Sequence, residues 1–149
     1  MRNNTILEIE ERDFEQLYNL LESTFNFNVE INKMKELYNL SKENKETHIL
    51  GYYKNDEIIG TLLYNILILP NAKWITIWNV AVKEEFKRQG IATKLMKEVD
   101  KVAEKDKDIS RLWLFSGTHR EDAHRLYEKL GYNGNIDKGF VKIVNGEEE

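Results

Sequence analysis

The sequence predicts one α/β domain, which some schemes class as α+β, with a central mixed, mostly antiparallel sheet and helices on both of its faces. Its 149 residues, 41% hydrophobic and 32% charged, suit a single core, so we expect residues 1–149 to form one domain. Apolar side chains occupy both faces of residues 74–82, which is typical of a central strand covered on both sides. A helical pattern and another apolar run follow within about 40 residues and predict a right-handed crossover between parallel strands.

The first 70 residues predict a strand, two helices and a hairpin. A short strand at 5–10 precedes two stretches in which apolar residues recur at intervals of three and four, the second at about 30–42. These helical stripes are Phe14, Leu17, Tyr18 and Leu21, and then Ile31, Met34, Leu37 and Tyr38. The period then shortens, and residues 47–69 read as two strands joined at Asn55–Asp56, because Asn and Asp tolerate the left-handed backbone of a tight turn.

The second half predicts the crossover and three terminal elements. A helix at 91–105 buries a stripe of small and branched apolar residues, and a buried strand follows at 111–117. Thr118 is a candidate cap of the last helix, which Gly131 ends. A final short strand is expected at 139–144.

Composition removes several classes of protein. No apolar run reaches the roughly 18 residues of a membrane span, and the N-terminus has no signal-peptide core, so we expect a soluble, cytoplasmic protein with no membrane partner. The absence of Cys excludes disulfides, a thiolate nucleophile and Cys-based zinc sites. His48, His119 and His124 show no paired spacing, so no metal site is expected.

Charge is divided unevenly along the chain. Residues 1–70 carry 7 Lys and Arg against 12 Asp and Glu, whereas residues 71–149 carry 15 against 14. The basic residues of the second half alternate with acids, as in KEVDKVAEKDKD, which is typical of a solvated helix. We therefore expect no nucleic-acid partner.

The turn KRQGIA, residues 87–92, joins the central strand to the crossover helix. The first amides of a helix lack intrahelical partners and carry partial positive charge, so they attract phosphate. Gly90 removes the Cβ that would hold an anion away, and Lys87, Arg88 and Lys94 add positive charge. The turn lacks the G-K-[ST] and G-x-G-x-x-G patterns of nucleotide folds. It therefore indicates a pyrophosphate site, although Gly90 could equally serve only the sharp turn.

Two segments carry a family resemblance. NVAVKEEFKRQGIATKLM and SGTHREDAHRLYEKLGY resemble the two signature segments of the GNAT superfamily of acyl-CoA-dependent N-acetyltransferases. The matching positions are Lys87, Gly90 and Ala92 in the first segment, and Ala123, Tyr127, Gly131 and Tyr132 in the second. The order of predicted elements also matches that fold. Lys87 replaces the usual Arg or Gln, and Arg120 stands where many members have Asn.

The resemblance implies acetyl-CoA as cosubstrate. Its pyrophosphate would lie on the backbone amides of Arg88 to Thr93, and its pantetheine arm would pair with Val80 to Val82 as a peptide pairs with a strand edge. The central strand would accordingly stop pairing with its neighbour near Asn79. The implied cofactor-binding residues are Val80, Ala81, Val82, Lys87, Arg88, Gln89, Gly90, Ile91, Ala92, Thr93 and Arg120.

The resemblance also implies two catalytic groups. The backbone N–H of Val80 would stabilise the oxyanion, and the Tyr127 phenol would protonate the departing thiolate. By pattern alone Tyr127 could instead be a core aromatic. The general base stays open, with His119, Glu121, or helix carboxylates such as Glu22 and Glu30 as unranked candidates, and with proton relay through water as the alternative.

The expected activity is direct acetyl transfer to a primary amine, with a small cationic amine as acceptor because the acidic first half borders the acceptor site in GNAT-like folds. Phe25, Phe27, Trp74 and Trp78 are candidates to line that site, or else to fill the core. The alternatives are a protein or peptide N-acetyltransferase and a non-catalytic acyl-CoA-binding sensor. The sequence leaves open whether the protein is a monomer or a homodimer.

Overall fold

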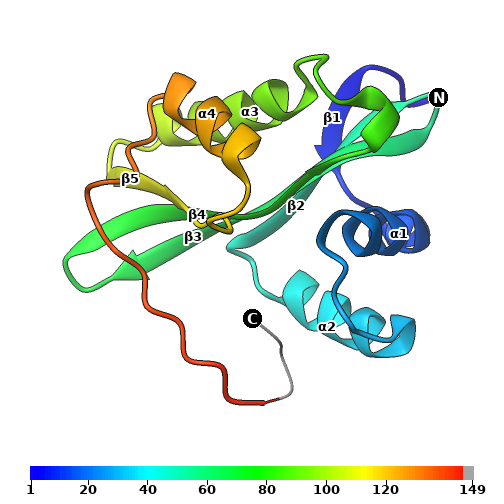
Figure 1. The fold of residues 1–149 in the computed structure, drawn as a ribbon, viewed down its shortest axis with the longest axis horizontal. Helices are drawn as coiled ribbons and strands as arrows, with labels where there is room; N and C mark the ends of the chain where they lie inside the picture. Colours follow the sequence, from blue (N-terminus) through cyan, green and yellow to red (C-terminus); the bar gives the residue numbers. More distant parts are fainter. Residues whose placement is uncertain (146–149) are drawn as a thin grey trace. The chain divides into compact units, whose positions relative to one another are not determined.

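A computed structural model describes residues 1–145, so the three terminal glutamates lie outside the described residues. The chain forms two compact units that divide after Leu114, and Figure 1 shows the helices and strands of each. The first unit contains β1 (Thr5–Glu8), η1 (Glu11–Asp13), α1 (Phe14–Phe25), α2 (Ile31–Glu43), β2 (Thr47–Lys54), β3 (Glu57–Leu69), β4 (Ala72–Val82), η2 (Glu84–Phe86), α3 (Ile91–Lys105) and β5 (Ile109–Leu114). The second contains α4 (Glu121–Lys129).

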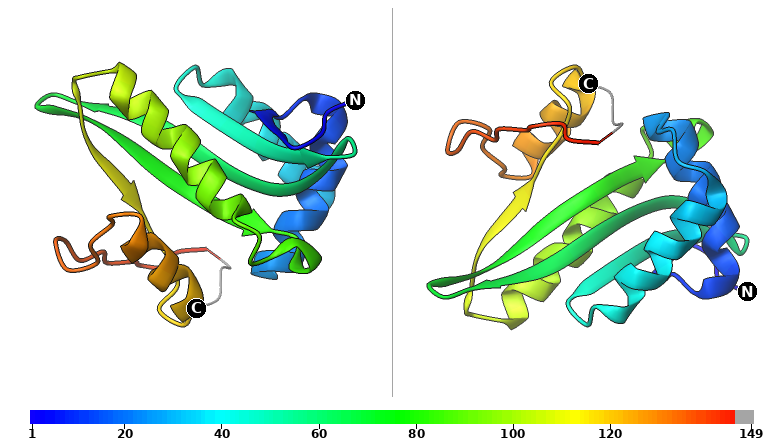
Figure 2. Two further views of the ribbon diagram at one scale, coloured as in Figure 1. Left: turned by 90° about the horizontal axis from the view of Figure 1, so that it is seen from above. Right: turned by 90° about the horizontal axis from the view of Figure 1, so that it is seen from below.

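The sheet has the mixed topology that the sequence predicts. Its strand order is β1-β2-β3-β4-β5, with antiparallel pairing from β1 to β4 and parallel pairing between β4 and β5. The crossover through α3 produces the parallel pair. Helix α3 covers one face of the sheet, and α1 and α2 cover the other (Figure 2). The predicted fold class is therefore confirmed.

The β2–β3 hairpin confirms the predicted turn. Asn55 and Asp56 both have positive φ, 52° and 65°, between the last residue of β2 and the first of β3. A two-residue loop with both residues in this region matches the right-handed twist of the flanking strands. This local chemistry sets the register of β2 against β3.

A hydrophobic core lies on each face of the sheet. Beneath α1 and α2 it contains Ile9, Phe14, Leu17, Leu20, Leu21, Tyr38, Ile49, Tyr53, Ile58 and Ala81. Leu95, Met96 and Val99 of α3 are at most 1% exposed. A Cβ at Gly60 of β3 would approach the Ile91 side chain to 2.7 Å. The first turn of α3 therefore lies directly on the sheet, which positions the turn that precedes it.

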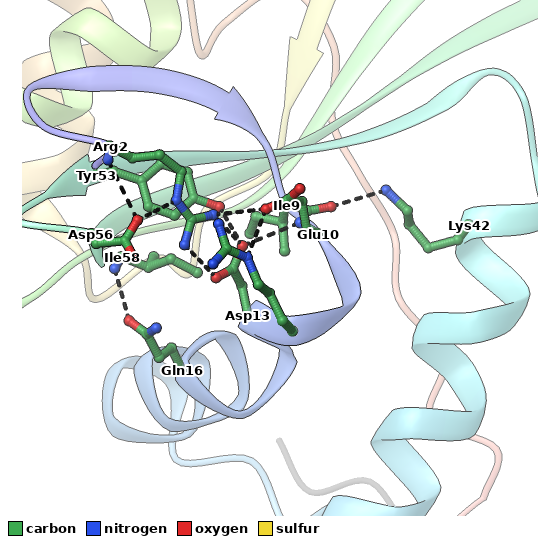
Figure 3. Close-up of polar contacts among 10 residues, drawn as sticks. Arg2, Ile9, Glu10, Asp13, Gln16, Lys42, Tyr53, Asp56 and Ile58 are labelled. Atoms are coloured by element: carbon green, nitrogen blue, oxygen red, sulfur yellow. Dashed lines mark hydrogen bonds and ion pairs between the residues drawn. The ribbon is translucent and has the colours of Figure 1, made fainter.

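A buried ionic cluster joins the N-terminal segment to the hairpin (Figure 3). Arg2 donates from both terminal nitrogens to Asp13, at 2.7 and 2.9 Å, and from Nε to Asp56 at 2.6 Å. Its guanidinium lies 4.0 Å from the ring centre of Tyr53, whose hydroxyl donates to Asp13 at 2.8 Å. Asp13 is 1% exposed and Tyr53 is fully buried. This cluster fixes the start of α1 against β2 and β3.

The cluster also sets the pKa values of its members. Burial alone would raise the pKa of Asp13, but hydrogen bonds from Arg2 and Tyr53 outweigh it and hold the pKa below its ordinary 3.8. Burial and the Asp13 carboxylate both raise the pKa of Tyr53. Asp13 is therefore ionised, and the positive charge that compensates it comes from Arg2.

The second unit corrects two predictions. Thr118 does not cap the last helix, because a turn in which Arg120 N–H donates to Gly117 O precedes α4, and the N-cap is Arg120. Residues 139–144 form no strand, and Phe140 and Val141 are 87% and 84% exposed. Alternating apolar residues become a strand only where another main chain lies alongside, and none of the strand pairings in residues 1–145 includes this segment.

Candidate active site

A β-bulge interrupts β4. Leu63 pairs with Trp78 and Thr61 pairs with Ala81, so two residues of β4, Asn79 and Val80, lie opposite one residue of β3. Asn79 has a φ of 56°, in the left-handed region. The bulge turns the main chain at the position where the sequence predicts that pairing stops.

The other edge of β4 is open beyond the bulge. Parallel pairing with β5 ends at Ile77 and Leu114, although β4 continues to Val82. The prediction that the central strand stops pairing with its neighbour near Asn79 is therefore confirmed on the side of β5. The predicted double coverage of β4 holds at Ile77, which is 1% exposed, but not at Trp78, which is 41% exposed. Residues 79–82 thus offer a main-chain edge to which an extended ligand with amide groups can bind.

The turn before α3 has the geometry of an anion site. Arg88 and Gly90 have positive φ, 65° and 80°, and Gly90 is the N-cap without a side-chain capping bond. The first amide to bond within the helix is that of Lys94, which donates to Gly90 O at 3.0 Å. The amides of Ile91, Ala92 and Thr93 precede it and have no intrahelical acceptor. A Cβ at Gly90 would meet no atom within 4 Å, so the space beside this residue is open.

The cations around this turn do not act alike. Lys87 Nζ lies 2.9 Å from Glu84 Oε2, and its hydrogen bond lowers the pKa of Glu84. Lys94 Nζ lies 5.8 Å from the ring centre of Tyr52. Arg88 and Lys94 form none of the ion pairs found in residues 1–145, so both can bind an anion without first breaking an ion pair, whereas Lys87 cannot.

A cavity of about 390 Å³ opens between the helix pair α1–α2 and the sheet. It is lined by Leu17, Leu21, Phe25, Phe27, Val29, Met34, Leu37, Tyr38, Ser41, Ile49, Thr61, Leu63 and Asn79. Phe25 and Phe27 line this cavity, whereas Trp74 and Trp78 do not; the ring centre of Trp74 instead lies 5.5 Å from that of Trp113. Because Asn79 belongs to the bulge, the cavity and the open strand edge meet at one residue.

The candidate general bases of the first unit do not line the cavity. Glu30 is the exposed N-cap of α2, and Glu22 is half-buried on α1. His48 pairs with Glu8 at 2.9 Å and stacks on Tyr64. The cavity residues from β2 and β3, such as Thr61 and Leu63, were not identified from the sequence, because alternation shows that a strand residue is buried but not which face borders a cavity.

A profile of the Acetyltransferase (GNAT) family matches residues 14–132, which is more than half of the chain. The chain belongs to the GNAT family of acetyltransferases. GNAT enzymes are acyltransferases that use acetyl-CoA as cosubstrate, and the bulged β4 and the turn at Gly90 lie within the matched region.

Several known proteins are similar to this GNAT chain. The [ribosomal protein bS18]-alanine N-acetyltransferase of Escherichia coli strain K12 is 31% identical over 75 residues, which is 50% of this chain and 50% of that protein. The chain therefore spans about half the length of this curated relative in the alignment. A transcriptional regulator from Bacillus halodurans C-125 superposes with a TM-score of 0.80 at 22% identity, covering 93% of this chain and 99% of that one. A ribosomal-protein-alanine N-acetyltransferase from Brucella melitensis biovar Abortus 2308 gives 0.75 at 19% identity, covering 94% and 99%. The two structural likenesses show the fold.

The second GNAT signature lies on α4, in the second unit. The carbonyl of Tyr127 accepts hydrogen bonds from the amides of Leu130 and Tyr132, and the rings of Tyr127 and Tyr132 pack edge to face at 6.3 Å. Gly131 ends the helix with a φ of 96°, as predicted. Burial raises the pKa of Tyr127 above its ordinary 10.0, although the charge of Arg120 opposes this. Tyr127 therefore keeps its proton at neutral pH.

Within residues 1–145, no helix combines the length and the apolar character needed to cross a lipid bilayer. The same residues contain no cluster of three or more His, Cys, Asp or Glu side chains placed to hold a metal ion.

Proposed function

We propose that this chain is an acetyl-CoA-dependent N-acetyltransferase that transfers the acetyl group directly to the primary amine of a small molecule. The observation that carries this proposal is the arrangement around β4 in the first unit. An open strand edge, a helix N-terminus without a side-chain cap and a small cavity all adjoin residues 79–93. These are the features needed to bind an extended amide arm, a pyrophosphate and an acceptor.

The residues then have distinct roles. The amides of Ile91, Ala92 and Thr93, with Arg88, would bind the pyrophosphate, and residues 80–82 would pair with the pantetheine arm. Lys87, Gln89 and Arg120 complete the proposed cofactor-binding set. Bound acetyl-CoA supplies an activated acetyl group. The N–H of Val80 would donate to the carbonyl oxygen as negative charge develops there.

Proton transfer completes the reaction. The amine nitrogen forms a bond to the acetyl carbon, the carbon–sulfur bond breaks, and the thiolate sulfur takes the proton of the Tyr127 hydroxyl. The proton that the nitrogen loses as the amide forms returns, through solvent, to the Tyr127 phenolate. The acceptor ammonium must first lose a proton, since an amine of pKa roughly 10.4 is almost entirely charged at neutral pH. Because no carboxylate lines the cavity, we propose that water at the open end beside Asn79 accepts this proton.

The proposal is tested by measuring thiol release from acetyl-CoA with a panel of primary amines, together with calorimetric binding of acetyl-CoA. Thiol release with any amine, accompanied by an acetylated product, would support it. The similarity to ribosomal-protein-alanine N-acetyltransferases favours a protein N-terminus as the second candidate acceptor. The panel therefore includes a short peptide with N-terminal alanine. Failure to bind acetyl-CoA would overturn both assignments.

The role of Gly90 is tested by Gly90→Asn. Asn tolerates a left-handed backbone, so the turn at φ 80° is expected to form and the melting temperature to change little. The new side chain would extend into the open space beside the helix N-terminus. We expect the dissociation constant for acetyl-CoA to rise by about tenfold or more, which corresponds to about 1.4 kcal/mol. An unchanged dissociation constant would mean that Gly90 serves only the turn.

A further inference from the structure

The lining of the α1–α2 cavity contains no ionisable acid or base other than the Tyr38 phenol. Nine of its thirteen residues are aliphatic, aromatic or Met side chains without a polar hydrogen-bonding group. Its volume of about 390 Å³ lies at the low end of the range for small-molecule sites. The acidic character of the first half of the chain therefore does not extend into the cavity.

Of the four polar side chains in the lining, two already donate hydrogen bonds to main-chain carbonyls, one is buried without a hydrogen-bond partner among residues 1–145, and one is exposed. Ser41 donates to the Tyr38 carbonyl at 2.7 Å, and Thr61 donates to the Leu50 carbonyl at 2.7 Å. The Tyr38 hydroxyl is closed off from solvent, and its ring packs 5.2 Å from that of Phe14. Only Asn79, at the bulge, presents an exposed polar side chain. The cavity is thus apolar along its length and polar at the β4 end.

This distribution restricts the charge of the acceptor. A second ammonium group inside the cavity would lose its hydration and find no carboxylate, which is strongly unfavourable. A single amine at the Asn79 end would keep its access to water and lie beside the open edge of β4. Polyamines and aminoglycosides carry several ammonium groups, and they do not match such a cavity.

We propose that the acceptor is a small monoamine with an apolar body, which binds with its body between α1 and α2 and its amine at Asn79. This inference rests on the proposed acetyltransferase function and names the substrate class of the same site. The carboxylates of the first half, including Glu22 and Glu30, do not line the cavity.

The first test compares 2-phenylethylamine with spermidine as acceptors for the full chain. We expect kcat/KM for 2-phenylethylamine to exceed that for spermidine by about 100-fold. Calorimetry with the protein saturated with coenzyme A is the readout that does not depend on turnover, and 2-phenylethylamine is expected to bind whereas spermidine is not. Binding of spermidine alone, or of neither amine, would overturn the inference.

The second test uses a matched pair of variants on α2. Met34 lines the cavity, whereas Leu40 is 57% exposed and does not. Met34→Glu places a carboxylate in the cavity and is expected to raise KM for 2-phenylethylamine about tenfold with little change in kcat, because it weakens binding of the body and not the reaction. Leu40→Glu is expected to change neither. Equal kinetics for the two variants would place the acceptor elsewhere.

The outcomes separate this inference from the proposed function. The monoamine assignment is overturned if spermidine is turned over faster than 2-phenylethylamine. It is also overturned if an alanine peptide is acetylated and 2-phenylethylamine is not. Either result still supports the proposed acetyltransferase activity. Absence of thiol release with every acceptor, together with absence of acetyl-CoA binding, overturns the transferase itself. Melting temperatures and acetyl-CoA affinity of both variants confirm that each one folds.

Discussion

Tyr127→Phe is expected to lower kcat by about 10²–10⁴-fold, the range that a positioned general acid contributes. Phenylalanine keeps the ring and its edge-to-face contact with Tyr132 but removes the proton that the thiolate would take. The dissociation constant of acetyl-CoA should stay unchanged, because the ring keeps its shape. Steady-state kinetics with the best acceptor of the panel, and calorimetry with acetyl-CoA, measure the two quantities.

The pH dependence gives a second readout for the same residue. Because burial raises the pKa of Tyr127 above 10.0, the acid is protonated at neutral pH and is lost only as pH rises through that higher value. The wild-type rate should therefore fall at the alkaline end, and Tyr127→Phe should lack that fall. Tyr132→Phe, in the same unit, is the control and should keep kcat. A Tyr127→Phe enzyme with wild-type kcat would remove Tyr127 from the mechanism.

Arg2→Met is expected to lower the free energy of unfolding by about 3–5 kcal/mol. The substitution leaves Asp13, which is 1% exposed, without the guanidinium that binds both of its oxygens. It also removes the cation from the ring of Tyr53 and the bond to Asp56. Chemical denaturation at pH 7 measures the difference. Arg12→Met is the control, because the Arg12 side chain is 63% exposed and its pairing with Glu10 should contribute less than about 1 kcal/mol.

The loss of unfolding free energy caused by Arg2→Met should become smaller as the pH falls. In the wild type the pKa of Asp13 in the folded protein lies below the ordinary 3.8 of the unfolded chain. The ionised Asp13 therefore makes its full contribution to the free energy of unfolding above the unfolded pKa, and this contribution is lost as pH falls through the folded pKa. In the variant, burial without Arg2 raises the pKa of Asp13, which can relieve its charge by binding a proton. The difference in unfolding free energy should therefore shrink from pH 7 toward pH 3. A difference that stays constant would mean that Asp13 charge does not cause the loss.

Local chemistry made much of the fold predictable from the sequence. The hairpin turn depends on two adjacent residues that tolerate positive φ, Asn55 and Asp56, and both adopt it. Helix α3 begins and ends at the predicted residues, because Gly90 allows the sharp turn before it and the apolar stripe repeats at helical intervals. The open helix amides at this turn follow from the same short segment.

The features of the fold that the sequence did not predict depend on contacts between segments far apart in the chain. Apolar alternation predicts a strand at 139–144, but a strand also requires a main-chain partner, which sequence alternation does not supply. The ion pair of Arg2 with Asp13 joins residues from separate elements, and their charges alone gave no sign that one carboxylate would be buried.

The sequence by itself therefore determined the family, the order of elements and the turn that would bind pyrophosphate, because each depends on residues close together in the chain. Only the tertiary structure decided the bulge at Asn79 and the apolar lining of the α1–α2 cavity. The cavity combines side chains from two helices and three strands. Its charge is set by which of them face inward, and the carboxylates counted along the first half of the chain face elsewhere.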